Sequence, residues 1–142
     1  MPGRRMLEHV NVRIDGASRG NPGRAGIGII ILDCDDNIIT THREYIGVET
    51  NNVAEYTALK RALEIAGSYC RKHVTILSDS ELLVKQRKGA YKTRKRHLKS
   101  IAKEVDELEQ GFETVEYRTV PREENREADR LANRAIDQGS LS

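Results

Sequence analysis

Four acidic residues stand where the surrounding pattern predicts apolar ones. Asp15 ends a segment in which apolar and polar residues alternate, and Asp79 comes at the end of a short apolar segment. Glu55 and Asp129 share helical faces with alanine, leucine and isoleucine residues that are expected to pack on a sheet. Because an unpaired charge on an apolar face is costly, these four positions are candidates for a functional site.

If one fold gathers these carboxylates, their mutual repulsion needs compensation. Two unit charges about 4 Å apart repel by about 4 kcal/mol at an effective dielectric constant of about 20. The four histidines are scattered and no pair has the spacing of a zinc site, so oxygen ligands are expected. Mg²⁺ or Mn²⁺ suits such ligands, because both bind carboxylates together with substrate phosphates. The predicted chemistry is metal-assisted phosphoryl transfer.

Each acidic residue taken alone also has a structural interpretation. Glu55 is spaced to form a capping box with Asn52, and Asp79 is placed to cap the helix that follows it. Asp15 precedes a glycine, as turn residues often do, and Asp129 could be an ordinary surface acid. The functional interpretation gains weight because a single fold would bring all four to one place.

Hydrophobic periodicity predicts the elements that position these residues. Alternating or continuous apolar runs indicate strands, and apolar residues three and four apart indicate helices, the first of them capped by Asn51 or Asn52. The expected strands cover residues 8–15, 27–32, 38–46, 73–77 and 112–120, and the expected helices cover 51–68, 80–88, 93–109 and 123–137.

The resulting order is β-β-β-α-β-α-α-β-α, which favours a mixed five-stranded α/β sheet with helices on its faces. A crossover through the first helix makes the first and fourth strands parallel neighbours. Since ligands commonly bind beyond the carboxyl ends of such strands, Asp15 and Asp79 are expected at the same edge of the sheet.

Length and composition exclude several classes of protein. A chain of 142 residues with 37% hydrophobic residues and a net charge of +2 is expected to form one domain over residues 1–142, with flexible ends at 1–7 and 138–142. No apolar run approaches the roughly 20 residues of a membrane span, and MPGRRMLEHV lacks the apolar region of a signal peptide. A cytoplasmic monomer is expected, with Cys34 and Cys70 as buried free thiols.

Four segments carry a resemblance to a known family. DGASRGNPGRAGIG, TNNVAEYTAL, LSDSELLVKQ and NREADRLAN resemble, in order and spacing, the motifs of the type 1 ribonuclease H family, and most closely its archaeal-like branch. The resemblance extends from Asn11 to Ile136. It implies the ribonuclease H-like fold, with strand order 3-2-1-4-5 when the strands are numbered along the chain.

The resemblance also implies an activity. Members cleave the RNA strand of RNA–DNA hybrids by a two-metal mechanism that leaves 5′-phosphate and 3′-hydroxyl ends. By likeness, Asp15 contacts both Mg²⁺ or Mn²⁺ ions, Asp129 helps to hold the ion that activates water, and Glu55 and Asp79 hold the other. Glu55 would also contact a ribose 2′-hydroxyl.

Four further positions match substrate-contacting residues of the family: Asn21, Thr50, Asn51 and Asn52. Asparagine and threonine also form caps and turns, so a purely structural role remains open.

The sequence departs from the family at two positions. Many members have a histidine on the loop before the last aspartate, whereas this chain has Arg122, which could act on phosphate or lie in solvent. Glu81 replaces a glutamine of many relatives, and its charge would repel a phosphate backbone. The rate and the metal preference are therefore open.

A basic segment from Lys85 to Lys99 contains eight lysine or arginine residues in fifteen. Such a segment beside a carboxylate cluster is typical of a surface that follows phosphates, with Lys85, Tyr91 and Lys92 as candidate contacts. A solvated helical face is the alternative. Two alternative functions stay open: a related nuclease for double-stranded RNA or junctions, and a non-catalytic nucleic-acid-binding module. An actin-like ATPase would require a duplicated half and a nucleotide pocket, which this length excludes.

Overall fold

The computed structural model describes residues 6–89 and 96–139. Three strands come first, β1 (Leu7–Gly20), β2 (Gly23–Leu32) and β3 (Ile38–Glu49). They are followed by α1 (Asn51–Ala66), β4 (Cys70–Ser78), α2 (Glu81–Arg87) and α3 (Arg96–Glu109). The last elements are β5 (Thr114–Thr119), the 3₁₀ helix η1 (Arg122–Asn125) and α4 (Arg126–Gly139).

The strands form one mixed sheet in the order β3-β2-β1-β4-β5. The first three strands pair antiparallel, as two hairpins require, whereas β1, β4 and β5 run parallel because helices connect them. This order and the sequence of elements confirm the predicted fold.

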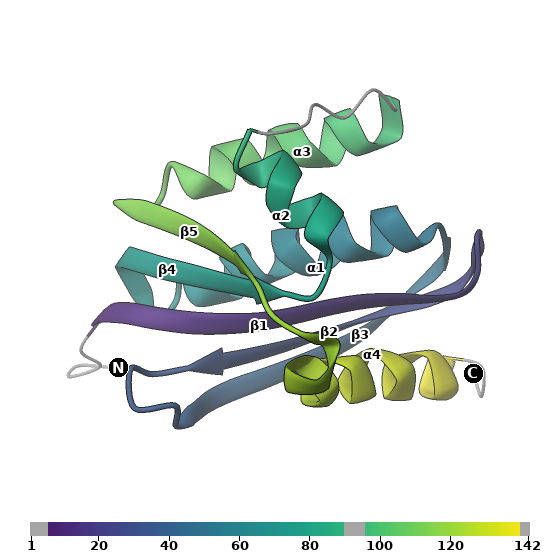
Figure 1. The fold of residues 1–142 in the computed structure, drawn as a ribbon, viewed down its shortest axis with the longest axis horizontal. Coiled ribbons are helices and arrows are strands. Elements are labelled where there is room, and N and C mark those ends of the chain that lie inside the picture. The colour runs from purple at the N-terminus through teal and green to yellow at the C-terminus, as the bar shows by residue number, and fades with distance from the viewer. Residues whose placement is uncertain (1–5, 90–95, 140–142) are drawn as a thin grey trace.

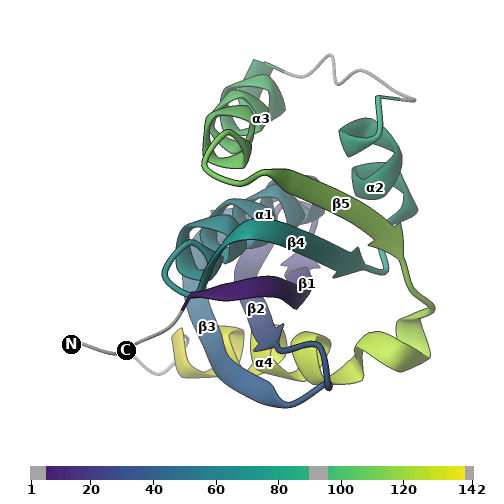
Figure 2. The ribbon, with the colours of Figure 1, turned by 90° about the vertical axis from the view of Figure 1, so that its left-hand side faces the viewer.

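Helices cover both faces of the sheet (Figures 1 and 2). Helices α1, α2 and α3 lie on one face, and α4 lies on the other beneath β2 and β3. The main core lies between the sheet and α1, where Ile27, Ile29 and Ile31 of β2 meet Leu59 and Leu63 of the helix. Because β2 is buried on both faces, its sequence is nearly continuously apolar.

Strand β1 is longer than predicted. The strand was expected to end at Asp15, but its antiparallel pairing with β2 continues to the pair Gly20 and Gly23, with the turn at Asn21 and Pro22. The parallel pairing of β1 with β4 ends earlier, at Arg13 and Leu77. Asp15 therefore lies just beyond the point where β1 and β4 separate, rather than at a strand end.

Two glycines let helices approach the sheet closely beside the acidic residues. A β-carbon on Gly16 would lie 2.3 Å from the backbone carbon of Ala54, directly before Glu55. A β-carbon on Gly28 would lie 2.2 Å from the backbone oxygen of Ala128, directly before Asp129. The absence of side chains at these two positions thus sets how near α1 and α4 can bring their carboxylates.

Several predicted boundaries and environments are corrected. The last helix was expected from Glu123, but η1 occupies residues 122–125 and α4 starts at Arg126. The helix expected from Thr93 is α3, which begins at Arg96, and residues 93–95 lie outside the described part. Cys34 is exposed, against expectation, because it lies in the turn between β2 and β3, whereas Cys70 is buried.

Within residues 6–89 and 96–139, no helix is long and apolar enough to cross a membrane.

Candidate active site

The four acidic residues singled out from the sequence line one cleft of about 410 Å³. Each comes from a different part of the fold: Asp15 from β1, Glu55 from α1, Asp79 from the junction of β4 and α2, and Asp129 from α4. The cleft is therefore assembled by the tertiary fold from elements on both faces of the sheet.

Asp15 lies at the centre of the four carboxylates, since each of the other three affects its pKa. Only 8% of its surface is exposed, and burial raises its pKa to about 9. The Asp79, Asp129 and Glu55 carboxylates add to this rise by repulsion, and a hydrogen bond with Asp129 favours the protonated form. Without cations, Asp15 therefore keeps its proton at neutral pH.

Glu55 has a similar environment. Burial raises its pKa to about 7, and repulsion by Asp79 adds to the rise, while a hydrogen bond with the Ser80 side chain opposes it. The capping-box interpretation is wrong, since Thr50 caps α1 by accepting from the Val53 amide at 3.2 Å. The capping role predicted for Asn51 or Asn52 therefore belongs to Thr50.

Asp79 and Asp129 have more polar surroundings. Burial raises the pKa of Asp79, while a hydrogen bond from the Asn125 side chain and the Arg122 charge oppose the rise. Asp79 does not cap α2, because Ser80 does so by accepting from the Leu83 amide. Asp129 accepts a 3.3 Å hydrogen bond from Asn133 Nδ2, one helical turn later.

The residues predicted to contact substrate separate into two groups. Asn51 lines the cleft, and its Nδ2 donates to Glu55 Oε1 at 3.4 Å. Asn21 lies in the β1–β2 turn, where its Oδ1 accepts from the backbone N–H of Asn51 at 3.1 Å. Thr50 and the half-buried Asn52 belong to the same start of α1, but they do not line the cleft. The structure thus places Asn51 beside the carboxylates, bonds Asn21 to the backbone of Asn51, and gives Thr50 a capping role.

The basic residues are placed differently. Arg122 lines the cleft with the carboxylates, whereas Lys85 is exposed on α2. Tyr91 and Lys92 lie outside the described residues. Arg87, counted in the basic segment, is not a solvated charge: its side chain is 8% exposed, and its Nη2 lies 2.7 Å from Asp106 and 2.9 Å from Glu109 of α3.

Sequence reasoning missed three polar residues at the site: Ser80, Asn125 and Asn133. Asn133 follows Asp129 by four residues, a spacing that places both on one side of a helix and could have identified it. Ser80 and Asn125 lie within the LSDSELLVKQ and NREADRLAN motifs, but no local pattern distinguishes them from their neighbours. Their partners lie on other elements, so spacing within the chain could not reveal them.

The chemistry of the site fits hard divalent cations. Four carboxylates with oxygen-only donors line the cleft, and burial together with repulsion by the other three raises the pKa of Asp15, so a bound cation would favour its ionised form. In the described part of the chain, no three histidine, cysteine, aspartate or glutamate side chains are arranged to hold a metal ion by themselves. This arrangement suits Mg²⁺ or Mn²⁺, which keep water ligands and complete their coordination with substrate oxygens.

Comparison with known proteins identifies relatives over nearly the whole chain. A family model described as reverse transcriptase-like matches residues 13–135. A ribonuclease HI of Halobacterium salinarum is 41% identical over 128 residues, which cover 90% of this chain and 64% of that protein. A protein of Mycobacterium tuberculosis named as bifunctional is 37% identical over 134 residues, 94% of this chain and 37% of that protein. The chain thus spans less than two thirds of the length of these relatives.

Solved structures are similar in fold as well. The RNase H1 crystal structure from the halophilic archaeon Halobacterium salinarum has a TM-score of 0.88 and 40% identity, covering 92% of this chain and 98% of that chain. LC11-RNase H1, isolated from compost and crystallised with an RNA/DNA hybrid, has a TM-score of 0.87 and 39% identity, covering 94% of this chain and 99% of that chain. With this likeness and the four carboxylates in place, the chain belongs to the type 1 ribonuclease H family.

Proposed function

We propose that the protein is a metal-dependent endoribonuclease that cleaves the RNA strand of RNA–DNA hybrids and leaves 5′-phosphate and 3′-hydroxyl ends. The observation that carries the proposal is the meeting of Asp15, Glu55, Asp79 and Asp129 in one cleft. Relatives named ribonuclease HI, and a relative crystallised with an RNA/DNA hybrid, support the substrate class.

Together, the four carboxylates would bind two Mg²⁺ or Mn²⁺ ions. Asp15, at the centre, would contact both ions, Asp129 one of them, and Glu55 and Asp79 the other. Bound here, the ions would stabilise negative charge on the attacking and leaving oxygens of the phosphodiester. The carboxylates themselves orient the reaction, since each is fixed by a different element.

Selection of RNA would come from polar groups beside the carboxylates. Glu55 would accept a hydrogen bond from a ribose 2′-hydroxyl, the group that distinguishes RNA from DNA. Asn51 lines the cleft and Asn21 is bonded to its backbone, so this pair would contact the substrate backbone or groove. Thr50 and Asn52 would support that contact from the start of α1, and Lys85 and Lys92 would follow phosphates further away.

Arg122 takes the place that a loop histidine has in many relatives. Because its guanidinium lines the cleft and acts on Asp79 through its charge, it would bind a substrate phosphate and limit repulsion among the carboxylates. All four carboxylates come from one chain, so we infer that the single domain is active as a monomer, and we place it in the cytoplasm.

Cleavage of three labelled duplexes tests the proposal. The RNA–DNA hybrid, double-stranded RNA and double-stranded DNA are each incubated with Mg²⁺ or Mn²⁺ and with wild-type or Asp79→Asn protein. We expect selective cleavage of the hybrid, abolished by EDTA and reduced at least about 10³-fold by the substitution, because a metal-binding carboxylate is lost. Asp35→Asn, an exposed carboxylate outside the cleft, is the matched control and should retain activity.

Other outcomes would point to other functions. Equal cleavage of all three duplexes would contradict selectivity for hybrids. Hybrid binding without products would identify a non-catalytic binding module.

A further inference from the structure

We propose that Asn125 is a positioning residue that holds three of the four carboxylate-bearing elements in the arrangement that binds divalent metal ions. The inference rests on the proposed function, because it assigns a purpose to the carboxylate cluster. Asn125 belongs to η1 and does not line the cleft, so it is not expected to touch substrate.

The contacts of Asn125 join separate elements. The residue is completely buried (0% exposed), and its Nδ2 donates a 2.8 Å hydrogen bond to the backbone oxygen of Ile14, the residue before Asp15. Its side chain also lies close enough to the Asp79 carboxylate to lower the pKa of that group, as a hydrogen-bond donor does. One amide group therefore links β1 at Asp15 to the end of β4 at Asp79.

The chemistry of these neighbours explains why the residue is an asparagine. Both partners are hydrogen-bond acceptors, so the amide must turn its NH₂ group, with two donors, toward them. Its Oδ1 has no protein partner within residues 6–89 and 96–139. An aspartate would offer only oxygen to the two acceptors, and a leucine of similar size would leave both without a donor.

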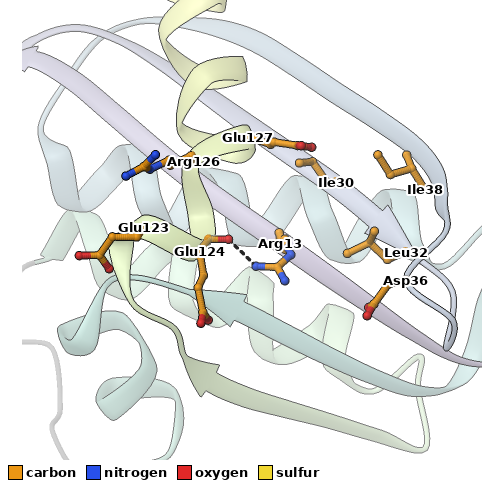
Figure 3. A pocket seen from close by; sticks show the side chains of 9 residues that line it. All are labelled: Arg13, Ile30, Leu32, Asp36, Ile38, Glu123, Glu124, Arg126 and Glu127. Carbon is orange, nitrogen blue, oxygen red and sulfur yellow. Dashed lines mark hydrogen bonds between the residues drawn. The ribbon is translucent and has the colours of Figure 1, made fainter.

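A second hydrogen bond anchors the same segment to β1. Arg13 Nη1 donates to the backbone oxygen of Glu124 at 2.6 Å, as Figure 3 shows in a second pocket, which Arg13 and Glu124 help to line and which contains none of the four carboxylates. Two consecutive residues of η1 are thus attached to two consecutive residues of β1, Arg13 and Ile14. Only the attachment through Asn125 also reaches a carboxylate of the site.

The third element follows directly from η1. Helix α4 starts at Arg126, and Asp129 lies four residues after Asn125, about one helical turn. Fixing Asn125 against β1 and Asp79 therefore also fixes the start of the helix that carries Asp129. Glu55 on α1 is outside this linkage, because its close approach is set at Gly16.

Calorimetric titration with Mn²⁺ on the folded protein tests the inference without relying on activity. We expect Asn125→Leu to weaken Mn²⁺ binding by about 10-fold or more, the range seen when groups that orient metal ligands are removed. The Mg²⁺ concentration for half-maximal hybrid cleavage should rise in parallel, while the KM for hybrid at saturating Mg²⁺ should stay within about twofold. Asn125→Ser, which keeps a single donor, should give an intermediate affinity.

Arg13→Gln is the matched control, because it removes the neighbouring anchor of the same segment without touching a carboxylate of the site. Its Mn²⁺ affinity should stay within about twofold of wild type even if its melting temperature falls. Wild-type Mn²⁺ affinity in a folded Asn125→Leu or Asn125→Ser protein would overturn the proposal. An equal loss of affinity in Arg13→Gln, or no Mn²⁺ binding by the wild type, would also overturn it.

The titration separates this inference from the proposed function. A wild-type protein that binds Mn²⁺ but cleaves no hybrid would contradict the function while leaving the positioning role supported by the binding data. Hybrid cleavage with the same metal requirement in wild type and Asn125→Leu would contradict the positioning role alone.

Discussion

Asp15→Asn should abolish hybrid cleavage and, in metal-free protein at neutral pH, raise the melting temperature. The loss of activity follows because Asp15 is the carboxylate that we propose contacts both metal ions. The gain in stability follows because the same carboxylate is buried among three others, and that surrounding raises its pKa from 3.8 to about 9. Function and stability are therefore expected to change in opposite directions at this position.

The sign follows from linkage between protonation and folding. The pKa of Asp15 is higher in the folded than in the unfolded protein, so its contribution to stability is fully present below about pH 4. That contribution is lost as the pH rises from about 4 toward 9. At pH 7 the cost is up to about 4 kcal/mol, from about 1.4 kcal/mol per pH unit. Asparagine is neutral at every pH, and its NH₂ group can still donate to Asp129.

Thermal unfolding with EDTA, followed by circular dichroism, measures this effect. Asp15→Asn should melt at least about 4 °C above wild type at pH 7, with a smaller difference at pH 5. Asp35→Asn removes the same charge at an exposed position and should melt within about 2 °C of wild type. Equal or lower stability of Asp15→Asn at pH 7 would contradict the raised pKa of Asp15 in the folded protein.

Metal affinity should depend steeply on pH. Metal ions bind ionised carboxylates. Ions that enter the cleft must therefore displace the protons that Asp15 and Glu55 keep because their pKa values are raised. Asp15 keeps its proton up to about pH 9, and Glu55 keeps its proton up to about pH 7. The apparent dissociation constant for Mg²⁺ should therefore fall about tenfold per pH unit above pH 7 and by as much as 100-fold per unit below it.

Calorimetry in buffers of different ionisation enthalpy gives the number of protons released at each pH. We expect up to two protons near pH 6 and about one near pH 8. In Glu55→Gln the release near pH 6 should fall to about one, although Mg²⁺ binds more weakly. Binding without proton release at pH 6 would contradict the raised pKa values on which this prediction depends.

Hydrophobic periodicity identified most of the architecture. The isoleucines of β2 and the alanines and leucines of α1 define their elements by spacing alone, and the order of elements then leaves few topologies. The end of β1 could not be predicted, because antiparallel pairing carries the strand through glycines and charged residues up to Gly20. Tertiary pairing here outweighs local composition.

The acidic residues of the site could be predicted from the sequence, because charges interrupt apolar patterns at Asp15, Glu55, Asp79 and Asp129. The groups that orient them were not. Asn125 is an ordinary polar residue in a polar segment, and only its burial beneath β1 reveals its role. Arg87 was likewise counted as a surface charge, because its partners Asp106 and Glu109 lie on another helix.

The most direct measurement is the position of Mn²⁺ in crystals of the protein bound to an RNA–DNA hybrid, located by anomalous scattering. Asp79→Asn protein can be used to prevent cleavage during crystallisation. We expect Mn²⁺ in the cleft, in contact with Asp15 and a phosphate of the RNA strand. A hybrid bound with its RNA strand in the cleft but without metal at Asp15, or Mn²⁺ only at other surfaces, would contradict a metal-dependent nuclease built on these carboxylates.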